Sequence, residues 1–265
     1  MSGVPRPAST ICLVRDPPGG PEVVMVRRTP EARFMGGAWV FPGGAVDPTD
    51  GSDTAHAAVP CSSTEMLPWI AAAIRELVEE TGIWLLESGT IVTSDRPSDV
   101  AVFSDILERG ECFAGDALRY FANWITPKPL PVRFDTRFFA ATMPPGLDPV
   151  VDRIELVDAR WIRPPDAFDL ADAGEWNLAF PTRKILEFLA GFSTTATLGE
   201  NFERQSDIPP IQPRLVVVDG QVTILMPDDP GFDEAAAGES DPALLSALER
   251  IARSDGETPP EIGSP

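Results

Sequence analysis

The chain has 265 residues, with 41 acidic side chains, 21 basic side chains and one histidine, so its formal charge at pH 7 is −20. This length predicts one large domain or two small ones, and 43% hydrophobic residues are enough to form a buried core. A strongly negative protein repels phosphate backbones, which excludes a broad nucleic-acid-binding surface. The sequence has no run of about 18 apolar residues, so no membrane span is expected.

The cysteines and the histidine exclude further classes. Cys12, Cys61 and Cys112 are odd in number and widely spaced, which predicts neither a disulfide framework nor a zinc site. We therefore expect a reducing, cytoplasmic location. His56 has no partner pattern for a catalytic triad and is expected on the surface. Many Arg, Ala and Pro residues with only two lysines suggest a bacterial gene rich in GC.

The first third of the chain predicts two strands, a glycine-rich segment, a loop and a helix. The strands are expected at residues 9–14 and 23–28, with a further short strand at 38–41. Residues 47–64 are rich in Asp, Ser, Thr, Ala and Gly, which predicts an exposed loop. A helix is expected from Pro68 to a stop at Thr81-Gly82, because its apolar residues recur with a period near 3.6.

Strands and helices alternate downstream, which favours a layered α/β or α+β sheet. Helices are predicted at residues 99–107, 115–120, 165–170 and 181–190, and strands at residues 123–126, 136–142 and 154–162. The pair Asp219-Gly220 predicts a hairpin over residues 214–226. Residues 228–265 contain ten acidic residues and two arginines. We expect one short helix around Leu244 and Leu248 in this otherwise disordered tail.

The segment with the clearest chemistry is residues 75–83, which read Arg-Glu-Leu-Val-Glu-Glu-Thr-Gly-Ile. On a helix Glu76 lies beside Glu79 and Glu80, because residues three and four apart are neighbours. Like charges at this spacing destabilise a helix unless a cation lies among them, and carboxylate oxygens favour Mg²⁺ or Mn²⁺. The alternative is a solvated acidic face that binds no metal.

With the Gly-Gly turn upstream, this segment resembles the box of the Nudix hydrolase family, G-x5-E-x7-R-E-U-x-E-E-x-G-U, in which U is aliphatic. Gly44 and residues 75–83 match the box. The spacing departs from it, because 31 positions separate Gly44 from Arg75 where the box has 14, so about 17 residues are inserted. Leu67 stands at the position of the first Glu, with Glu65 and Asp47 nearby, and the role of that Glu is left unassigned.

A narrower resemblance is to the peroxisomal coenzyme A diphosphatase branch and its bacterial relatives. It rests on residues 28–44, 72–76, 123–127 and 133–139 and extends over most of residues 10–192. The resemblance implies a Nudix α/β/α sandwich with a mixed sheet over residues 5–210. A C-terminal β-hairpin over residues 211–228 and an acidic, largely disordered tail over residues 229–265 would follow.

The resemblance also implies a reaction. The expected function is Mg²⁺- or Mn²⁺-dependent hydrolysis of the diphosphate linkage in a nucleoside diphosphate derivative, with coenzyme A or acyl-coenzyme A the leading substrate. ADP-ribose, a nucleotide sugar and an oxidised nucleotide are alternatives, because the box binds only metal and diphosphate. A non-catalytic nucleotide-sensing or partner-binding module is the alternative from another class.

The roles implied by the resemblance fall on few residues. Glu76, Glu79 and Glu80 would bind the metal, and either Glu79 or Glu155 would act as general base. Arg75 would pair with a box carboxylate and orient it, the alternative being an ordinary surface ion pair. The residues expected to bind substrate are Arg28, Arg33, Gly43, Gly44 and Arg133. The expected partner is a small molecule, with no nucleic acid and no membrane, and relatives of this fold often form homodimers.

Overall fold

A computed structural model describes residues 3–32, 35–94, 101–151, 153–235 and 241–254. The chain divides into two compact units. The first unit comprises Met1–Pro7, Ala122–Thr136 and Pro209–Pro265, and the second comprises Ala8–Phe121 and Arg137–Ile208. The acidic helix and the glycine-rich turn both belong to the second unit.

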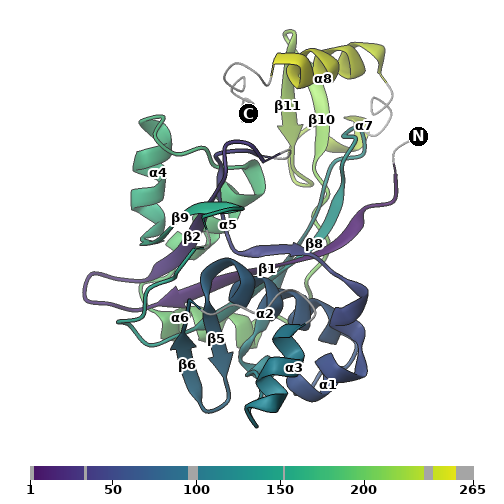
Figure 1. The fold of residues 1–265 in the computed structure, drawn as a ribbon. Coiled ribbons are helices and arrows are strands. Elements are labelled where there is room, and N and C mark those ends of the chain that lie inside the picture. Colours follow the sequence, from purple (N-terminus) through teal and green to yellow (C-terminus); the bar gives the residue numbers. More distant parts are fainter. Residues whose placement is uncertain (1–2, 33–34, 95–100, 152, 236–240, 255–265) are drawn as a thin grey trace. The chain divides into compact units, whose positions relative to one another are not determined.

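The main sheet has seven strands in the order β3-β2-β1-β8-β7, with β4 paired to β1 and β9 paired to β2. Figure 1 labels β1, β2, β8 and β9 of this sheet. Its strands are β1 (Arg6–Arg15), β2 (Glu22–Arg28), β3 (Trp39–Val40), β4 (Gly43–Ala45), β7 (Arg119–Ile125), β8 (Phe134–Thr142) and β9 (Leu156–Ile162). The predicted strands are thereby confirmed, with ends that differ by a few residues.

Helices cover both faces of this sheet within the second unit. The helices there are α1 (Asp53–Ala58), α2 (Leu67–Thr81), α3 (Ala101–Glu108), α4 (Pro164–Asp172), α5 (Phe180–Ala190) and α6 (Thr195–Arg204). Adjacent residues of a strand point to opposite faces. Phe139 of β8 joins the core under α2, whereas Phe138 contacts Phe121, whose ring packs on Phe188 of α5 and Phe202 of α6. The expected α/β/α sandwich is confirmed.

Helix α2 confirms the strongest local prediction. Pro68 lies in its first turn, where a missing N–H is tolerated. Gly82 ends it with a φ of 66°, a left-handed conformation that favours glycine. Ile70, Ile74 and Leu77 are buried along one side. Burial of this stripe fixes the rotation of the helix, and hence the direction in which its acidic residues project.

The prediction of an exposed loop at residues 47–64 is wrong. The segment contains the 3₁₀ helix η1 (Pro48–Gly51) and helix α1. Its small polar residues cap helices instead of forming coil, since the Ser52 hydroxyl accepts a hydrogen bond from the Ala55 N–H at 3.2 Å. Ala55, Ala58 and Val59 are completely buried. The insertion is therefore part of the core.

Other differences have local causes. Residues 115–120, predicted as a helix, form the 3₁₀ turn η2 (Gly115–Ala117) and the start of β7, where aromatic residues favour a strand. Helix α6 and the hairpin of β5 (Ile83–Leu86) and β6 (Gly89–Val92) are elements that the sequence did not predict. The helices predicted near residues 99–107, 165–170 and 181–190 are confirmed by α3, α4 and α5, although residues 99 and 100 lie outside the described residues.

The first unit contains the predicted hairpin, formed by β10 (Arg214–Val218) and β11 (Gln221–Leu225). Asp219 and Gly220 have φ angles of 50° and 82°, as a tight primed turn requires. Helices α7 (Phe232–Ala235) and α8 (Pro242–Ser254) follow. Helix α8 contacts both strands and buries Leu244, which confirms the predicted short helix in the acidic tail.

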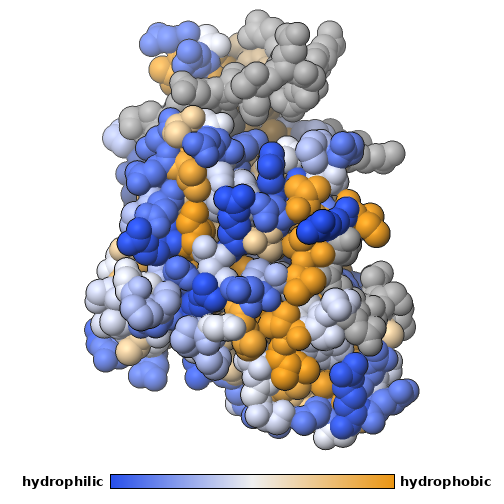
Figure 2. Space-filling view, turned by 60° about the vertical axis from the view of Figure 1, so that its left-hand side comes forward, coloured by the Kyte–Doolittle hydropathy of each residue, from blue (hydrophilic) through white to orange (hydrophobic). Residues whose placement is uncertain are grey.

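Charged and polar side chains dominate the face of the molecule shown in Figure 2, where hydrophobic residues gather in narrow bands. His56 is exposed, as predicted. Within the described residues, no helix is long and apolar enough to cross a membrane.

We expect Phe113→Ala to lower the free energy of unfolding by about 3–5 kcal/mol, because the fully buried ring stacks on Trp84 at 5.7 Å between centroids. Urea denaturation measures this change. Val4→Ala, at a position 91% exposed, is the control and should change stability by less than about 0.5 kcal/mol. Equal losses for the two variants would contradict the packing described here.

Candidate active site

The glycine turn lies directly against the acidic end of α2. The Gly43 N–H donates a hydrogen bond to Glu80 Oε2 at 2.9 Å. A side chain on Gly44 would collide with the carboxylate of Glu76, and one on Gly43 would collide with the backbone of β1. Glycine is therefore required at position 43, where β1 leaves no room for a Cβ atom, whereas a side chain at position 44 would displace the carboxylate of Glu76.

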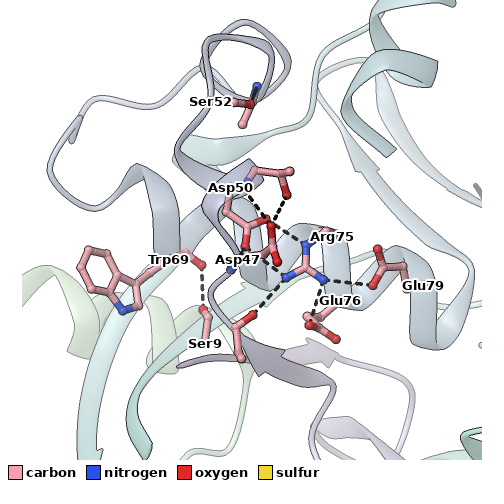
Figure 3. Close-up of polar contacts among 11 residues, drawn as sticks. Ser9, Asp47, Asp50, Ser52, Trp69, Arg75, Glu76 and Glu79 are labelled. Atoms are coloured by element: carbon pink, nitrogen blue, oxygen red, sulfur yellow. Dashed lines mark hydrogen bonds and ion pairs between the residues drawn. The ribbon is translucent and has the colours of Figure 1, made fainter. Parts of the chain in front are cut away.

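Arg75 joins the parts of the site (Figure 3). Its Nε and Nη2 donate to the two oxygens of Asp50 at 2.9 and 3.1 Å, and Nη2 also donates to the Ala45 carbonyl at 3.1 Å. Nη1 donates to Glu76 at 2.9 Å and to Glu79 at 3.0 Å. These bonds use all five N–H groups of the guanidinium. Arg75 is only 5% exposed, so the surface ion pair considered from the sequence is excluded.

The charges around Arg75 decide its protonation. Burial alone would lower the pKa of Arg75, but the hydrogen bond to Asp50 and the negative charges of Glu76, Asp50 and Glu79 raise it above its ordinary value. The side chain is therefore a permanent cation within the protein. The expectation that Arg75 pairs with box carboxylates holds for both Glu76 and Glu79 in this geometry.

Asp50 is a residue of the candidate site that was not predicted from the sequence. It is completely buried, and besides Arg75 it accepts a hydrogen bond from the Asp47 N–H at 2.8 Å. Leu67, which stands at the displaced box position, lies in the hydrophobic core, whereas Glu65 is exposed.

A signal for Asp50 was present in the sequence. Counted forward from Gly44, the spacing G-x5 ends on Asp50, whereas counting back from Arg75 ends on Leu67. The extra residues therefore follow the position of the first box acid, and an Asp occupies that position.

The carboxylates Glu76 and Glu80 lie close together with few counter-charges. Burial and the neighbouring charge of Glu76 hold the pKa of Glu80 well above its usual range, against the Gly43 hydrogen bond. Burial also raises the pKa of Glu76, while Arg75 lowers it. The charge of Glu155 raises the pKa of both groups, which places Glu155 near them. Excess negative charge therefore gathers at this end of α2.

Donor chemistry and charge at this end of α2 suit a hard divalent cation. Buried carboxylates that repel each other are stabilised by such an ion, and carboxylate oxygens are the ligands that Mg²⁺ and Mn²⁺ prefer. Within the part of the chain that the structure describes, no three potential ligands form a ready metal cage. Glu76 and Glu79 are held by Arg75, and Glu80 is held by Gly43.

The predicted substrate-binding arginines are placed differently. Arg28, at the end of β2, lies near enough to Glu80 for its charge to lower the pKa of that carboxyl. Its Nε is buried and has no hydrogen-bond partner among the described residues. Arg33 lies outside the described residues. Arg133 belongs to the first unit, where it is buried and donates to the carbonyls of Gly3 and Thr126.

A backbone hydrogen bond places Glu155 next to the end of β2. Its carbonyl accepts a hydrogen bond from the Thr29 N–H at 2.9 Å, directly after Arg28. The start of β9 is thereby held beside the end of β2, with which that strand pairs. Two segments far apart in sequence thus bring Arg28 and Glu155 to the acidic end of α2.

The geometry agrees with the comparisons to known proteins. The model of the NUDIX domain matches residues 5–183, so the chain belongs to the Nudix hydrolase family. It is 30% identical over 168 residues to "Putative nudix hydrolase 7" of Caenorhabditis elegans, covering 60% of this chain and 52% of that protein. The chain thus spans about half the length of that relative.

Two further relatives cover more of the chain. Acyl-coenzyme A diphosphatase NUDT19 of Homo sapiens is 27% identical, with 86% of this chain and 77% of that protein covered. The crystal structure of a NUDIX hydrolase from Alicyclobacillus acidocaldarius superposes with a TM-score of 0.64 at 28% identity, covering 78% of this chain and 99% of that chain. Fold and family therefore agree.

We expect Asp50→Ala to lower the free energy of unfolding by about 3–5 kcal/mol, because it leaves the buried Arg75 without its bidentate partner. Urea denaturation again provides the measurement. Glu65→Ala removes an exposed acid from the inserted residues that follow Asp50 and should change stability by less than about 0.5 kcal/mol. If Asp50→Ala lowered the free energy of unfolding no more than this control, the pairing of Asp50 with Arg75 would not contribute to stability.

Proposed function

We propose that the protein hydrolyses the diphosphate linkage of a nucleoside diphosphate derivative, most favourably coenzyme A or acyl-coenzyme A. The observation that carries the proposal is the partly buried pair Glu76 and Glu80 beside Gly43 and Gly44, in which Arg75 holds Glu76 and the Gly43 N–H holds Glu80. A module that only binds nucleotides has no need for a carboxylate pair that is costly to bury.

The metal in this proposal is Mg²⁺ or Mn²⁺, with Glu76, Glu79 and Glu80 as its ligands. Members of the family generally use divalent ions. When bound, such an ion offsets the charge of the phosphate oxygens and lowers the pKa of a water molecule. The ion pairs with Arg75 orient Glu76 and Glu79, and the hydrogen bond from the Gly43 N–H orients Glu80.

Two residues stay candidates for the general base. Glu79 lies on α2 and shares Arg75 with Glu76, so its orientation is fixed by a cation. Glu155 comes from the other side of the site and adds its charge to that around Glu76 and Glu80. Either group can accept a proton from a water molecule that attacks phosphorus.

Substrate phosphates need cations that the overall charge of −20 does not supply. Arg28 is the best placed of the arginines, because its Nε lacks a partner among the described residues while its charge already acts on Glu80. Arg33 and the backbone of Gly43 and Gly44 are proposed to complete this subsite. For Arg133, whose guanidinium holds two carbonyls, substrate binding stays a prediction.

The name of the human relative supports coenzyme A or an acyl derivative as substrate. ADP-ribose, a nucleotide sugar and an oxidised nucleotide are the competing substrates, and a nucleotide-sensing module is the non-catalytic alternative. The partner is a small molecule, with neither nucleic acid nor membrane involved, and the protein can act as a homodimer. Three free thiols suit a reducing cytoplasm.

A substrate panel tests this proposal. Coenzyme A, acyl-coenzyme A, ADP-ribose, nucleotide sugars and nucleoside triphosphates are incubated with the protein and Mg²⁺ or Mn²⁺, with chelator as control. We expect coenzyme A to be cleaved to 3′,5′-ADP and a phosphopantetheine product, detected by chromatography. Cleavage of another member alone would keep the reaction and reject the substrate, whereas no cleavage by folded protein would favour the binding module.

We expect Glu80→Gln to lower kcat by about 100-fold or more, which corresponds to roughly 2.7 kcal/mol of transition-state stabilisation. The substitution keeps the size of the side chain and removes its charge. Mn²⁺ binding, followed by calorimetry, should weaken in parallel. The matched control is Glu87→Gln at an exposed position after β5, and turnover of Glu80→Gln equal to that of the control would reject the metal assignment.

A further inference from the structure

The second unit contains a cavity of about 440 Å³ that lies away from the carboxylates. One wall is supplied by the insertion, one by the start of α2, and one by η2 with the strands β7 and β8. Its apolar lining is formed by Met66, Ile70, Leu118 and Phe139. This volume lies in the range of small-molecule sites, roughly 300–1,000 Å³.

Hydrogen bonds join the insertion to residues 113–116 on the opposite wall, so the shape of the cavity is held by specific contacts. The Ser62 N–H and hydroxyl both donate to the Asp116 carboxylate, at 2.7 and 3.0 Å. The Phe113 N–H donates to the Ala58 carbonyl at 2.8 Å. A Cβ atom on Gly115 would lie 2.5 Å from the Pro60 carbonyl oxygen, which shows how closely the two segments approach.

The charge of the lining selects an uncharged ligand. Asp116 and Arg119 are the only residues of its lining whose side chains are charged near neutral pH, and their formal charges cancel. The Asp116 carboxylate is engaged by Ser62, and Arg119 donates to the Asp116 carbonyl at 2.6 Å. The cavity therefore lacks the net positive charge that a phosphate group requires. It offers hydroxyl groups and apolar surface to a neutral chain.

Helix α2 connects this cavity to the carboxylates. Ile70 lines the cavity and Glu76 lies six residues further along the same helix, a rise of about 9 Å along the helix axis at 1.5 Å per residue. A chain-like group attached to a diphosphate at Glu76 spans such a distance. We propose that this cavity binds the uncharged, amide-containing arm of the substrate, which for coenzyme A is the pantetheine arm.

This inference rests on the proposed function, and Ser63→Trp tests it. Ser63 lines the cavity and is exposed, so a large ring there fills the cavity without disturbing the core. Thr64→Trp is the control, because Thr64 is exposed next to it and is not among the lining residues. We expect the KM for coenzyme A to rise at least fivefold in Ser63→Trp, with kcat within twofold of wild type, and no change in Thr64→Trp.

Inhibition by the two halves of the product provides a second readout. In Ser63→Trp, inhibition by phosphopantetheine should weaken at least fivefold, while inhibition by 3′,5′-ADP stays unchanged. Equal KM values for the two Trp variants, or equal weakening of inhibition by both product halves, would overturn the cavity assignment. Failure of the proposed function appears separately, as absent cleavage of coenzyme A by the wild-type protein, and it removes this arm as the ligand.

Discussion

The site depends on one buried cation whose every N–H group has an acceptor. Arg75 is bonded to Asp50 from η1, to the Ala45 carbonyl from β4, and to Glu76 and Glu79 from its own helix. A buried guanidinium without such partners would be strongly destabilising. The requirement to satisfy Arg75 therefore fixes how η1, the glycine turn and α2 meet.

The backbone of the glycine turn also holds the carboxylates of α2 in place. Gly43 and Gly44 let β4 lie directly on the acidic end of α2, so that a backbone N–H can serve Glu80. Burial raises the pKa of Glu76 and Glu80, so the ionised forms are disfavoured in the fold itself. Carboxyl groups with such shifted pKa values are typical of functional sites. A bound divalent ion would relieve it and favour the ionised carboxylates.

Local signals made much of the fold predictable. The apolar period of α2, Pro68 in its first turn and Gly82 directly after its last residue are all local signals, as is Asp219-Gly220 at the turn of its hairpin. The insertion was mispredicted because its composition suits a loop, while its structure depends on tertiary burial of Ala55 and Ala58. No periodicity in a six-residue helix such as α1 reveals such a contact.

In the proposed site, the segment of residues 48–66, which contains η1 and most of the inserted residues, would link recognition to chemistry. Its first turn supplies Asp50, which holds Arg75 and through it Glu76 and Glu79, and its last residues supply Ser63 and Met66 to the cavity. Between them Ala58 and Val59 are completely buried, so the two ends are joined by a segment that packs into the core. A group bound in the cavity and a diphosphate at Glu76 would therefore be positioned by the same piece of structure. Fixed positioning of this kind lowers the entropic barrier to reaction. A flexible loop in place of the folded segment would not lower that barrier.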